Sequence, residues 1–231
     1  MGTIYKPILF STEMVQAILD GRKTQTRRIV KKKFSNTDLT IKTDKYGSRL
    51  IERQNDVPEP KRNDDGTTTH HLVSFVECKP KYQIGDILWV RETYANPPLT
   101  AFSVPFIYKA DFDRTFCGWK PSIHMPKAAA RIFLEVVNVR CERLHDIKEE
   151  DAIAEGIHFD VMFKKFNCYL CDNQGHIGGE MMCEDGFYKT ALNSFSSLWQ
   201  SINGKRHTWQ SNPLVWVYEF KKIEKPTIWP Q

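Results

Sequence analysis

A short basic segment carries the residues best suited to chemistry. Residues 21–28 read Gly-Arg-Lys-Thr-Gln-Thr-Arg-Arg, which places Lys23 three residues before Thr26. Neighbouring cations disfavour an ammonium, so Lys23 should lose its proton more easily than an isolated lysine, and a neutral lysine can activate the Thr26 hydroxyl as a nucleophile. The alternative is a lysine and a threonine that only decorate a turn. The side chains that would hold phosphate or an oxyanion are Arg22, Arg27 and Arg28.

Glu155 stands where a carboxylate is not expected. It precedes Gly156, at the end of a segment whose pattern predicts a helix. A negative side chain there faces the negative end of the helix dipole, which costs about 0.3–1 kcal/mol. Because nothing near it in sequence offsets this cost, Glu155 is a candidate functional residue, although an exposed glutamate would also tolerate it.

A second set of reactive side chains has the spacing of metal ligands. The set begins with a Cys-x2-Cys pair and consists of Cys168, Cys171, His176 and Cys183. Four such ligands suit a closed tetrahedral zinc site, in which the metal would be structural. The set is similar to a zinc knuckle with a longer last spacing, and the alternative is a glycine-rich loop with free thiols. No other cofactor is expected.

Three helices should position these residues. Residues 11–20 have Ser11 as N-cap, an apolar stripe at helical spacing and Gly21 where a helix ends. Residues 146–155 have acids in the first turn, and residues 187–202 carry a long apolar stripe. The basic segment therefore starts where the chain leaves its first helix.

Strand patterns occupy most of the remaining chain. They cover residues 86–92, 106–110, 131–144 (as one long bent strand) and 214–223. Few strands alternate with helices, so the pattern favours an α+β fold, a mixed β-barrel with flanking helices, over a doubly wound sheet. A polar insertion over 35–75, with a small hairpin near Leu39–Ile41 and Arg49–Ile51, and a Cys/Gly-rich insertion over 158–186 interrupt a single domain that spans 1–231.

Composition indicates a cytoplasmic protein. The chain has 231 residues, is 41% hydrophobic, and shows neither a secretory signal nor an apolar run long enough to span a membrane. No membrane partner is expected, and its six cysteines are expected to be thiols or metal ligands.

The net charge is uneven. Residues 1–33 hold eight Lys or Arg against two acids, whereas the whole chain has a formal charge of only +5. A local basic patch is typical of a phosphate-rich partner, although a solvated basic face has the same composition.

Several segments resemble phage and prophage proteins of the ASCH superfamily, which are relatives of the PUA domain. The first is residues 6–11 followed by 14–31, the latter reading MVQAILDGRKTQTRRIVK. Later stretches with the same resemblance are GDILWVRET (85–93), WKPSIHMP (119–126), EEDAIAEGI (149–157) and LWQSING (198–204). The resemblance covers both ends and the middle of the chain but not the two insertions.

The resemblance implies a PUA-like barrel associated with RNA and modified nucleosides, in the host cytoplasm if a phage encodes the chain. A much shorter enzyme of the superfamily hydrolyses the acetyl amide of N4-acetylcytidine with a lysine, a threonine and a glutamate. By motif these match Lys23, Thr26 and Glu155. Side chains that would help bind the nucleic acid or nucleoside are Arg91, Trp119 and His124. The alternatives are an ion pair with Glu92 at a strand end for Arg91 and a hydrogen-bonded buried position for His124. Either Trp89 or Trp119 would stack on a base or pack in the core, and the core is the expected place for Trp89.

Three functions remain open at this point. The first is binding of RNA, DNA or a modified nucleoside through a basic cleft. The second is hydrolysis, either of an N-acylated nucleoside by the Lys23, Thr26 and Glu155 group or of RNA. The third is a structural or assembly role in a phage particle.

Overall fold

The centre of the molecule is a mixed five-stranded sheet. The computed structural model describes residues 5–34, 37–44, 47–54, 61–69, 75–97, 104–112, 118–162, 164–172, 175–176, 187–227 and 229. The sheet order is β1-β8-β11-β17-β2, with β1 and β8 parallel and the other neighbours antiparallel. Its strands are β1 (Tyr5–Leu9), β2 (Gln25–Ile29), β8 (Ile87–Arg91), β11 (Phe133–Arg143) and β17 (Leu214–Ile223). The α+β class is thus confirmed, whereas the pairings among the described strands leave β1 and β2 as edges and show no closed barrel.

The long antiparallel pair of β11 and β17 forms the spine of this sheet. Strand β11 has the predicted bend, because its register with β17 shifts between Val136 and Asn138, which is the mark of a β-bulge. Alternate side chains of β17 enter two different cores. Val215 and Val217 pack on the side of α2 and α3, whereas Tyr218 and Phe220 pack on the side of α1. Both faces of β17 are therefore covered.

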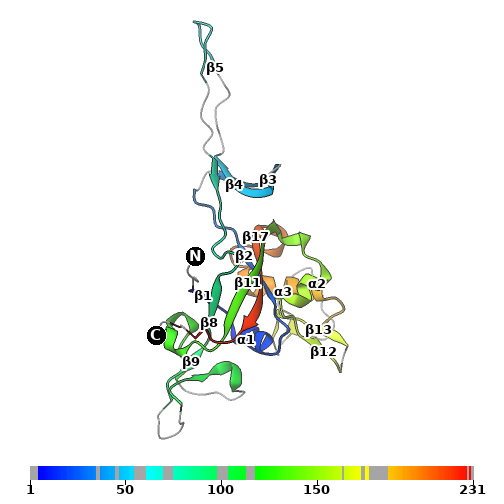
Figure 1. The fold of residues 1–231 in the computed structure, drawn as a ribbon. Helices are drawn as coiled ribbons and strands as arrows, with labels where there is room; N and C mark the ends of the chain where they lie inside the picture. Colours follow the sequence, from blue (N-terminus) through cyan, green and yellow to red (C-terminus); the bar gives the residue numbers. More distant parts are fainter. Residues whose placement is uncertain are drawn as a thin grey trace.

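Three helices flank the sheet (Figure 1). Helix α1 (Thr12–Leu19) begins at Ser11, whose hydroxyl accepts from the amide of Met14, and ends before Gly21, which has φ +76°. This confirms the predicted helix and its caps. Helices α2 (Glu149–Ala154) and α3 (Ala191–Asn203) lie together on the opposite side of β17 from α1.

Two helices and one strand are shorter than predicted. Residues 144–146 form a 3-10 turn, so the helix expected over 146–155 starts only at Glu149. The helix expected over 187–202 starts at Ala191, because the Thr190 side chain caps it and Phe187–Tyr188 pairs as β16 with β13 (Lys165–Asn167). The strand expected over 106–110 is only Ile107–Tyr108 (β10), which pairs with β9 (Tyr94–Ala95) before a 3-10 turn.

The polar insertion contains the predicted hairpin. β3 (Thr37–Asp44) and β4 (Gly47–Gln54) pair antiparallel, with Ile41 opposite Leu50, and β7 (Phe75–Glu77) adds a third strand. Figure 1 shows this unit and the short pair β5 (Lys61–Arg62) and β6 (Thr68–Thr69) reaching away from the central sheet. In the second insertion, β12 (Phe159–Asp160) pairs with β13, and β14 (Cys171–Asp172) pairs with β15 (Gly175–His176).

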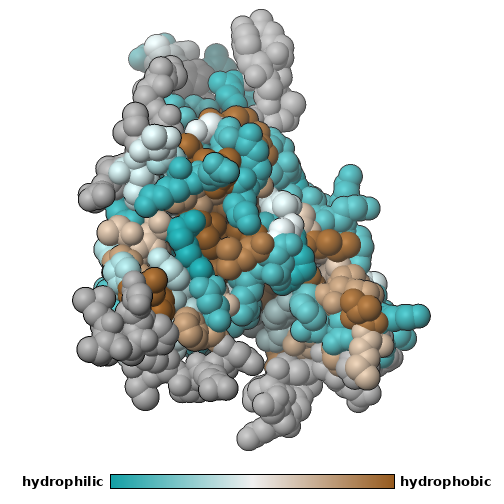
Figure 2. All heavy atoms as spheres, turned by 60° about the horizontal axis from the view of Figure 1, so that its bottom comes forward, coloured by the Kyte–Doolittle hydropathy of each residue, from teal (hydrophilic) through white to brown (hydrophobic). Residues whose placement is uncertain are grey.

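The described surface is mainly hydrophilic with scattered apolar residues. Figure 2, which brings the lower side of Figure 1 forward, shows apolar areas separated by polar ones. The most exposed large apolar side chains are Val161 and Met162, which follow β12. No described helix has the length and apolarity needed to cross a membrane.

Candidate functional site

The exit from α1 is clamped against the end of α2. The amide of Lys23 donates to the carbonyl of Ala17 at 2.9 Å, and the amide of Thr24 donates to the carbonyl of Ala154 at 2.9 Å. Lys23 and Glu155 face each other in an antiparallel bridge. Gly156 makes this approach possible, since it has φ +87° and a Cβ there would lie 2.8 Å from the Cβ of Lys23. Local backbone geometry thus brings two of the three predicted catalytic residues together.

The Lys23 amine is buried and fully hydrogen-bonded. Its Nζ donates to the carbonyl oxygens of Gln25 and Glu155 at 2.9 and 2.8 Å, and to Oε2 of Glu155 at 2.9 Å. Its side chain is 0% exposed. Burial lowers the pKa of Lys23, with Arg27 and Arg28 acting in the same direction and Glu155 opposing them. The direction matches the sequence prediction, but burial rather than the arginines is the main cause.

Glu155 is the point where two cations meet. Besides Lys23, it accepts from Nη1 of Arg27 at 3.1 Å through Oε1, and it is only 4% exposed. It is the C-cap residue of α2, as the sequence predicts. The unfavourable dipole is offset by cations that lie more than a hundred positions earlier in the chain.

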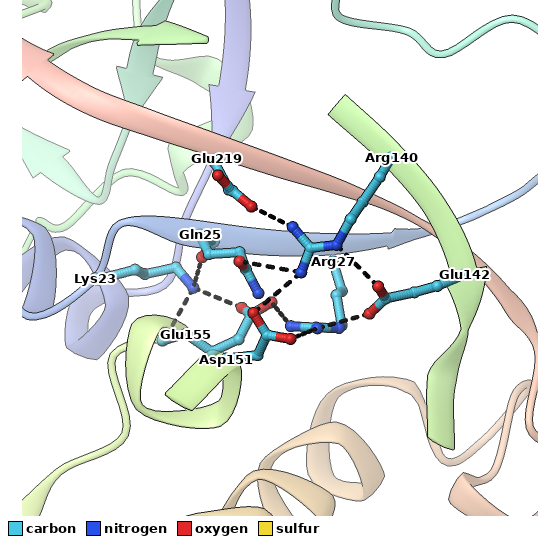
Figure 3. A network of polar contacts seen from close by, with 8 residues as sticks. All are labelled: Lys23, Gln25, Arg27, Arg140, Glu142, Asp151, Glu155 and Glu219. Atoms are coloured by element: carbon cyan, nitrogen blue, oxygen red, sulfur yellow. Dashed lines mark hydrogen bonds and ion pairs between the residues drawn. The ribbon is translucent and has the colours of Figure 1, made fainter. Parts of the chain in front are cut away.

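Arg27 extends this pair into a larger network (Figure 3). Its Nη2 lies 2.7 Å from Oε1 of Glu142 and 3.3 Å from Oδ2 of Asp151. Arg140 joins both of these carboxylates, at 2.9 and 3.0 Å, and also pairs with Glu219. Three cations and four acids are therefore linked, and they come from β2, β11, β17, α2 and the bridge between Lys23 and Glu155, with Lys23 at one end.

The electrostatics of the network favour ionised carboxylates. Burial alone would raise the pKa of Asp151, but Arg27 and Arg140 beside it hold that pKa below its ordinary value. Arg27 lies inside the network with a side chain that is 1% exposed, and it also lines the small cavity beside Thr26 and Glu155, so its contact with nucleic acid stays a prediction. Its role is to hold three acids.

Thr26 lies on the opposite face of β2 from Arg27. Strand alternation groups Thr26 with Arg28, whose guanidinium carbon lies 5.4 Å from the centroid of the Phe10 ring. Lys23 Nζ lies 5.6 Å from the same centroid. Thr26 is only 3% exposed, and among the residues that the structure describes its hydroxyl has no hydrogen-bond partner.

Two cavities adjoin at Glu155. The smaller, of about 70 Å³, runs along the edge of β2 and is lined by Thr26, Arg28 and Glu155 together with apolar residues of α3. The larger, of about 510 Å³, is lined by Glu155, Arg22 and His158, and shares Met14, Leu198 and Ile202 with the smaller. Ligand sites usually measure roughly 300–1,000 Å³. Only the larger cavity can hold a nucleobase, and the smaller can hold only a few atoms beside it.

The three other predicted binding residues lie elsewhere. Arg91 ends β8 and donates to the carbonyl of Ile123, whereas His124 is exposed in the 3-10 turn Ser122–His124. The half-buried Trp119 packs beside Phe112. None of the three lines the two cavities at Glu155, so the structure does not bring them to the predicted catalytic group.

Trp89 has the position predicted for it. It is 5% exposed and packs in the core against Phe133 and Trp229.

The predicted zinc ligands are only partly described. Cys168 lines the larger cavity, and the backbones of Cys171 and His176 pair across the β14–β15 hairpin. Cys183 lies outside the described residues. Within the part of the chain that the structure describes, no group of three or more His, Cys, Asp or Glu side chains is placed to hold a metal ion. A zinc site therefore stays a prediction.

The basic N-terminal region does not form one uniform patch. Five of its eight cations have carboxylates within 4 Å, and these are Lys6, Arg22, Lys23, Arg27 and Lys32. The remaining three, Arg28, Lys31 and Lys33, have no acidic partner among the described residues. The excess charge that can face a ligand is therefore concentrated at the end of β2 and in the residues just after it.

Sequence reasoning missed most of the charged network. Arg140 and Glu142 are two residues apart on β11, and this spacing places them on one face of a strand. That alternation was the available signal, but it does not say which distant cation they contact.

Comparison with known proteins gives no further information on the site, since neither a family model, nor a curated protein, nor a solved structure matches this chain.

Proposed function

We propose that this protein binds a nucleoside, free or within a nucleic acid, with its base in the cavity beside Glu155. The observation that carries the proposal is the junction of the two cavities, where a base-sized space meets a smaller space lined by Thr26 and Arg28. The Thr26 hydroxyl, which has no partner among the described residues, and the guanidinium of Arg28 offer hydrogen bonds to the polar edge of a base. The resemblance to the ASCH superfamily and its PUA-like barrel supports the same ligand class.

We rank binding above catalysis because the hydrogen bonds of Lys23 are those of a protonated amine. Its three donors meet three acceptors, which is the pattern of a charged ammonium at rest. An ammonium has no lone pair and cannot take a proton from Thr26. The arrangement is therefore complete as a structural ion pair that fixes Glu155 at the cavity wall.

Calorimetric titration with cytidine and N4-acetylcytidine tests the proposal. Thr26→Val removes the hydroxyl at nearly constant volume and should weaken binding about tenfold, as expected for one lost hydrogen bond in a water-poor site. Thr24→Val is the matched control, because Thr24 is exposed two residues away and should leave affinity unchanged. Equal affinity in wild type and Thr26→Val, or absence of binding to both nucleosides, would refute the proposal.

The second candidate function is hydrolysis of an N-acylated nucleoside. One observation favours it, which is the 2.9 Å hydrogen bond from Lys23 to Glu155 in a buried site. Transfer of one proton across this bond converts the ion pair into a neutral amine and a carboxylic acid without changing the net charge. Burial, which lowers the pKa of Lys23, favours that neutral form.

The neutral pair is suited to acyl transfer. The Thr26 oxygen attacks the amide carbonyl, its proton passes to the Lys23 amine, and Arg28 stabilises the oxyanion. The acid proton of Glu155 passes to the leaving nitrogen as the C–N bond breaks, which leaves an acyl ester on Thr26. Water then hydrolyses this ester and restores the hydroxyl.

Acetate release from N4-acetylcytidine distinguishes the two functions. Under hydrolysis, wild type and Thr24→Val release acetate, Thr26→Val does not, and mass spectrometry detects an acetyl group on the peptide that contains Thr26. Binding without acetate release would leave the first function alone. Cleavage of an RNA oligomer in parallel would support the ribonuclease alternative instead.

A further inference from the structure

A third cavity lies on the other side of Arg28 from Glu155. It has a volume of about 370 Å³ and shares Arg28 and Ile29 with the small cavity that Thr26 lines. Its cationic lining residues come from two distant segments, the end of β2 and the residues after β7, and are Arg28, Lys31, Lys33, Lys79 and Lys81. We call this cavity the basic groove.

The charge of the basic groove is only partly compensated. No carboxylate lines it, and among the described residues no carboxylate lies within 4 Å of any of its five cationic groups. Two acids lie behind the lining: Glu155 attracts Arg28 from the neighbouring cavity, and the buried Glu52 accepts from the backbone amide of Lys33. This contrasts with Lys23 and Arg27, whose charges are matched within the buried network. A cluster of five like charges raises the free energy of the fold unless an anion occupies it, so the groove fits a polyanionic ligand.

The floor of the basic groove offers an aromatic surface. Trp216 lies directly opposite Arg28 in the pairing of β17 with β2, so both side chains project from the same face of the sheet. Trp216 is half-buried, whereas Tyr82 and Tyr218 in the same lining are buried. A partly open indole ring among cations is the combination that stacks a base and holds its phosphates.

Together with an adjoining cavity, the groove is longer than one nucleoside. A further cavity of about 840 Å³ shares Ile29, Val30 and Lys31 with it. Its charged lining adds Lys32, which pairs with Asp38 of the same lining, and Arg143, with His207 beside them. Cavities thus follow one another from His207 past Lys31 and Arg28 to Glu155. A free nucleoside would use only one of them, whereas a chain of nucleotides can use all.

We propose that the basic groove binds single-stranded nucleic acid, with phosphates on its lysines and a base on Trp216, and leads the strand past Arg28 toward the Glu155 cavity. This inference deepens the proposed function by naming a polynucleotide as the ligand. Glu142 and Asp151 of the buried network contact Arg27, whose side chain is on the opposite face of β2 from Arg28, and no acid of the network lines the groove.

The experiment measures binding of fluorescein-labelled U15 and dT15 oligomers, which carry no modified base, to the full chain by anisotropy. If about four phosphates are neutralised, single-strand affinity should fall roughly 50-fold between 50 and 200 mM salt. In Lys79→Gln/Lys81→Gln the same salt change should cost only about sevenfold, since two contacts are gone. The matched control is Lys205→Gln/Lys225→Gln, two exposed lysines outside the groove lining, which should behave as wild type.

A second variant separates stacking from charge. Trp216→Leu should weaken oligomer binding at least fivefold without changing the salt dependence, provided that its melting curve shows a folded protein. Inorganic polyphosphate of similar charge carries no bases and should bind equally to wild type and Trp216→Leu. Comparison of U15 with dT15 shows whether the strand is RNA or DNA.

Three results would overturn the proposal: unchanged binding in the lysine pair variant, duplex bound as tightly as single strand, or polyphosphate bound as tightly as U15. Because the oligomers are unmodified and Thr26 is untouched, such a failure leaves the nucleoside titration to be judged separately. Conversely, loss of nucleoside binding in wild type would not explain salt-dependent binding of U15.

Discussion

Replacing Glu155 with Gln tests whether the buried ion pair exists as described. The substitution keeps the size of the side chain but removes the charge that Lys23 and Arg27 both face. Arg27 retains Glu142 and Asp151, whereas Lys23, with a side chain that is 0% exposed, loses the one carboxylate that it contacts among the described residues. An uncompensated buried charge costs about 3–5 kcal/mol.

The loss in this variant has an upper limit that depends on pH. Lys23 can give up its proton instead of remaining charged, and at pH 7 this costs about 4.6 kcal/mol, given a pKa near 10.4 in the unfolded chain. At pH 9 the same release costs only about 2 kcal/mol. Since burial lowers the pKa of Lys23 in the folded protein, the unfolded chain binds more protons between the two pKa values, and stability rises with pH across that window.

Thermal and urea unfolding at pH 7 and pH 9 measure this effect. In a chain of 231 residues the expected loss corresponds to a Tm about 6–20 °C lower at pH 7, and a clearly smaller decrease at pH 9. Glu150→Gln is the control, because Glu150 is exposed on the same helix and should cost less than about 1 kcal/mol. The double variant Lys23→Met/Glu155→Gln should recover part of the loss.

The reasoning fails if Glu155→Gln unfolds within about 1 °C of wild type at pH 7, or if its defect grows between pH 7 and pH 9. Either result would mean that Lys23 is not held charged against Glu155.

Two further predictions concern the packing around the site. Gly156→Ala should destabilise the protein by at least 2 kcal/mol in urea unfolding, more than Gly21→Ala, because both glycines have positive φ but only Gly156 would place a Cβ against Lys23. Equal losses in the two variants would contradict the close approach. Burial raises the pKa of Cys141 to about 12, so at pH 8.5 iodoacetamide should alkylate it roughly 10³-fold more slowly in the folded chain than in urea. Mass spectrometry of the peptide that contains Cys141 measures both rates, and similar rates would argue against its place in the sheet.

Elements with strong local signals could be predicted from the sequence. Helix α1 follows from its N-cap serine and terminal glycine, and β17 follows from strict alternation. Helix α3 begins later than its apolar stripe suggests, because Phe187 and Tyr188 pair with a strand of the second insertion. Pairing between segments of different insertions leaves no local signal, so this boundary could not be predicted.

In the candidate site, too, features with a local sequence signal could be predicted, whereas long-range contacts could not. The unfavourable place of Glu155 at a helix end was visible in the sequence, but its compensation by Lys23 and Arg27 is a long-range contact. The basic groove was only half predictable, because Lys79 and Lys81 come from a segment with no motif. Counting charge along the chain therefore did not show that Arg27 is paired with three acids, and it missed the lysines that line the basic groove.

The buried network fixes the position of the cationic segment, which a binding site requires. Arg27 and Lys23 hold one face of β2 to α2 and β11, and this fixes the position of the strand. Because side chains alternate along the strand, fixing one face also fixes Thr26 and Arg28 on the other. Under the proposed function, the residues that face the ligand are thus positioned by ion pairs of which only Glu155 lines the cavities. A substitution in the network should therefore impair nucleoside and oligonucleotide binding together, whereas substitutions at Thr26 or in the basic groove should impair one at a time.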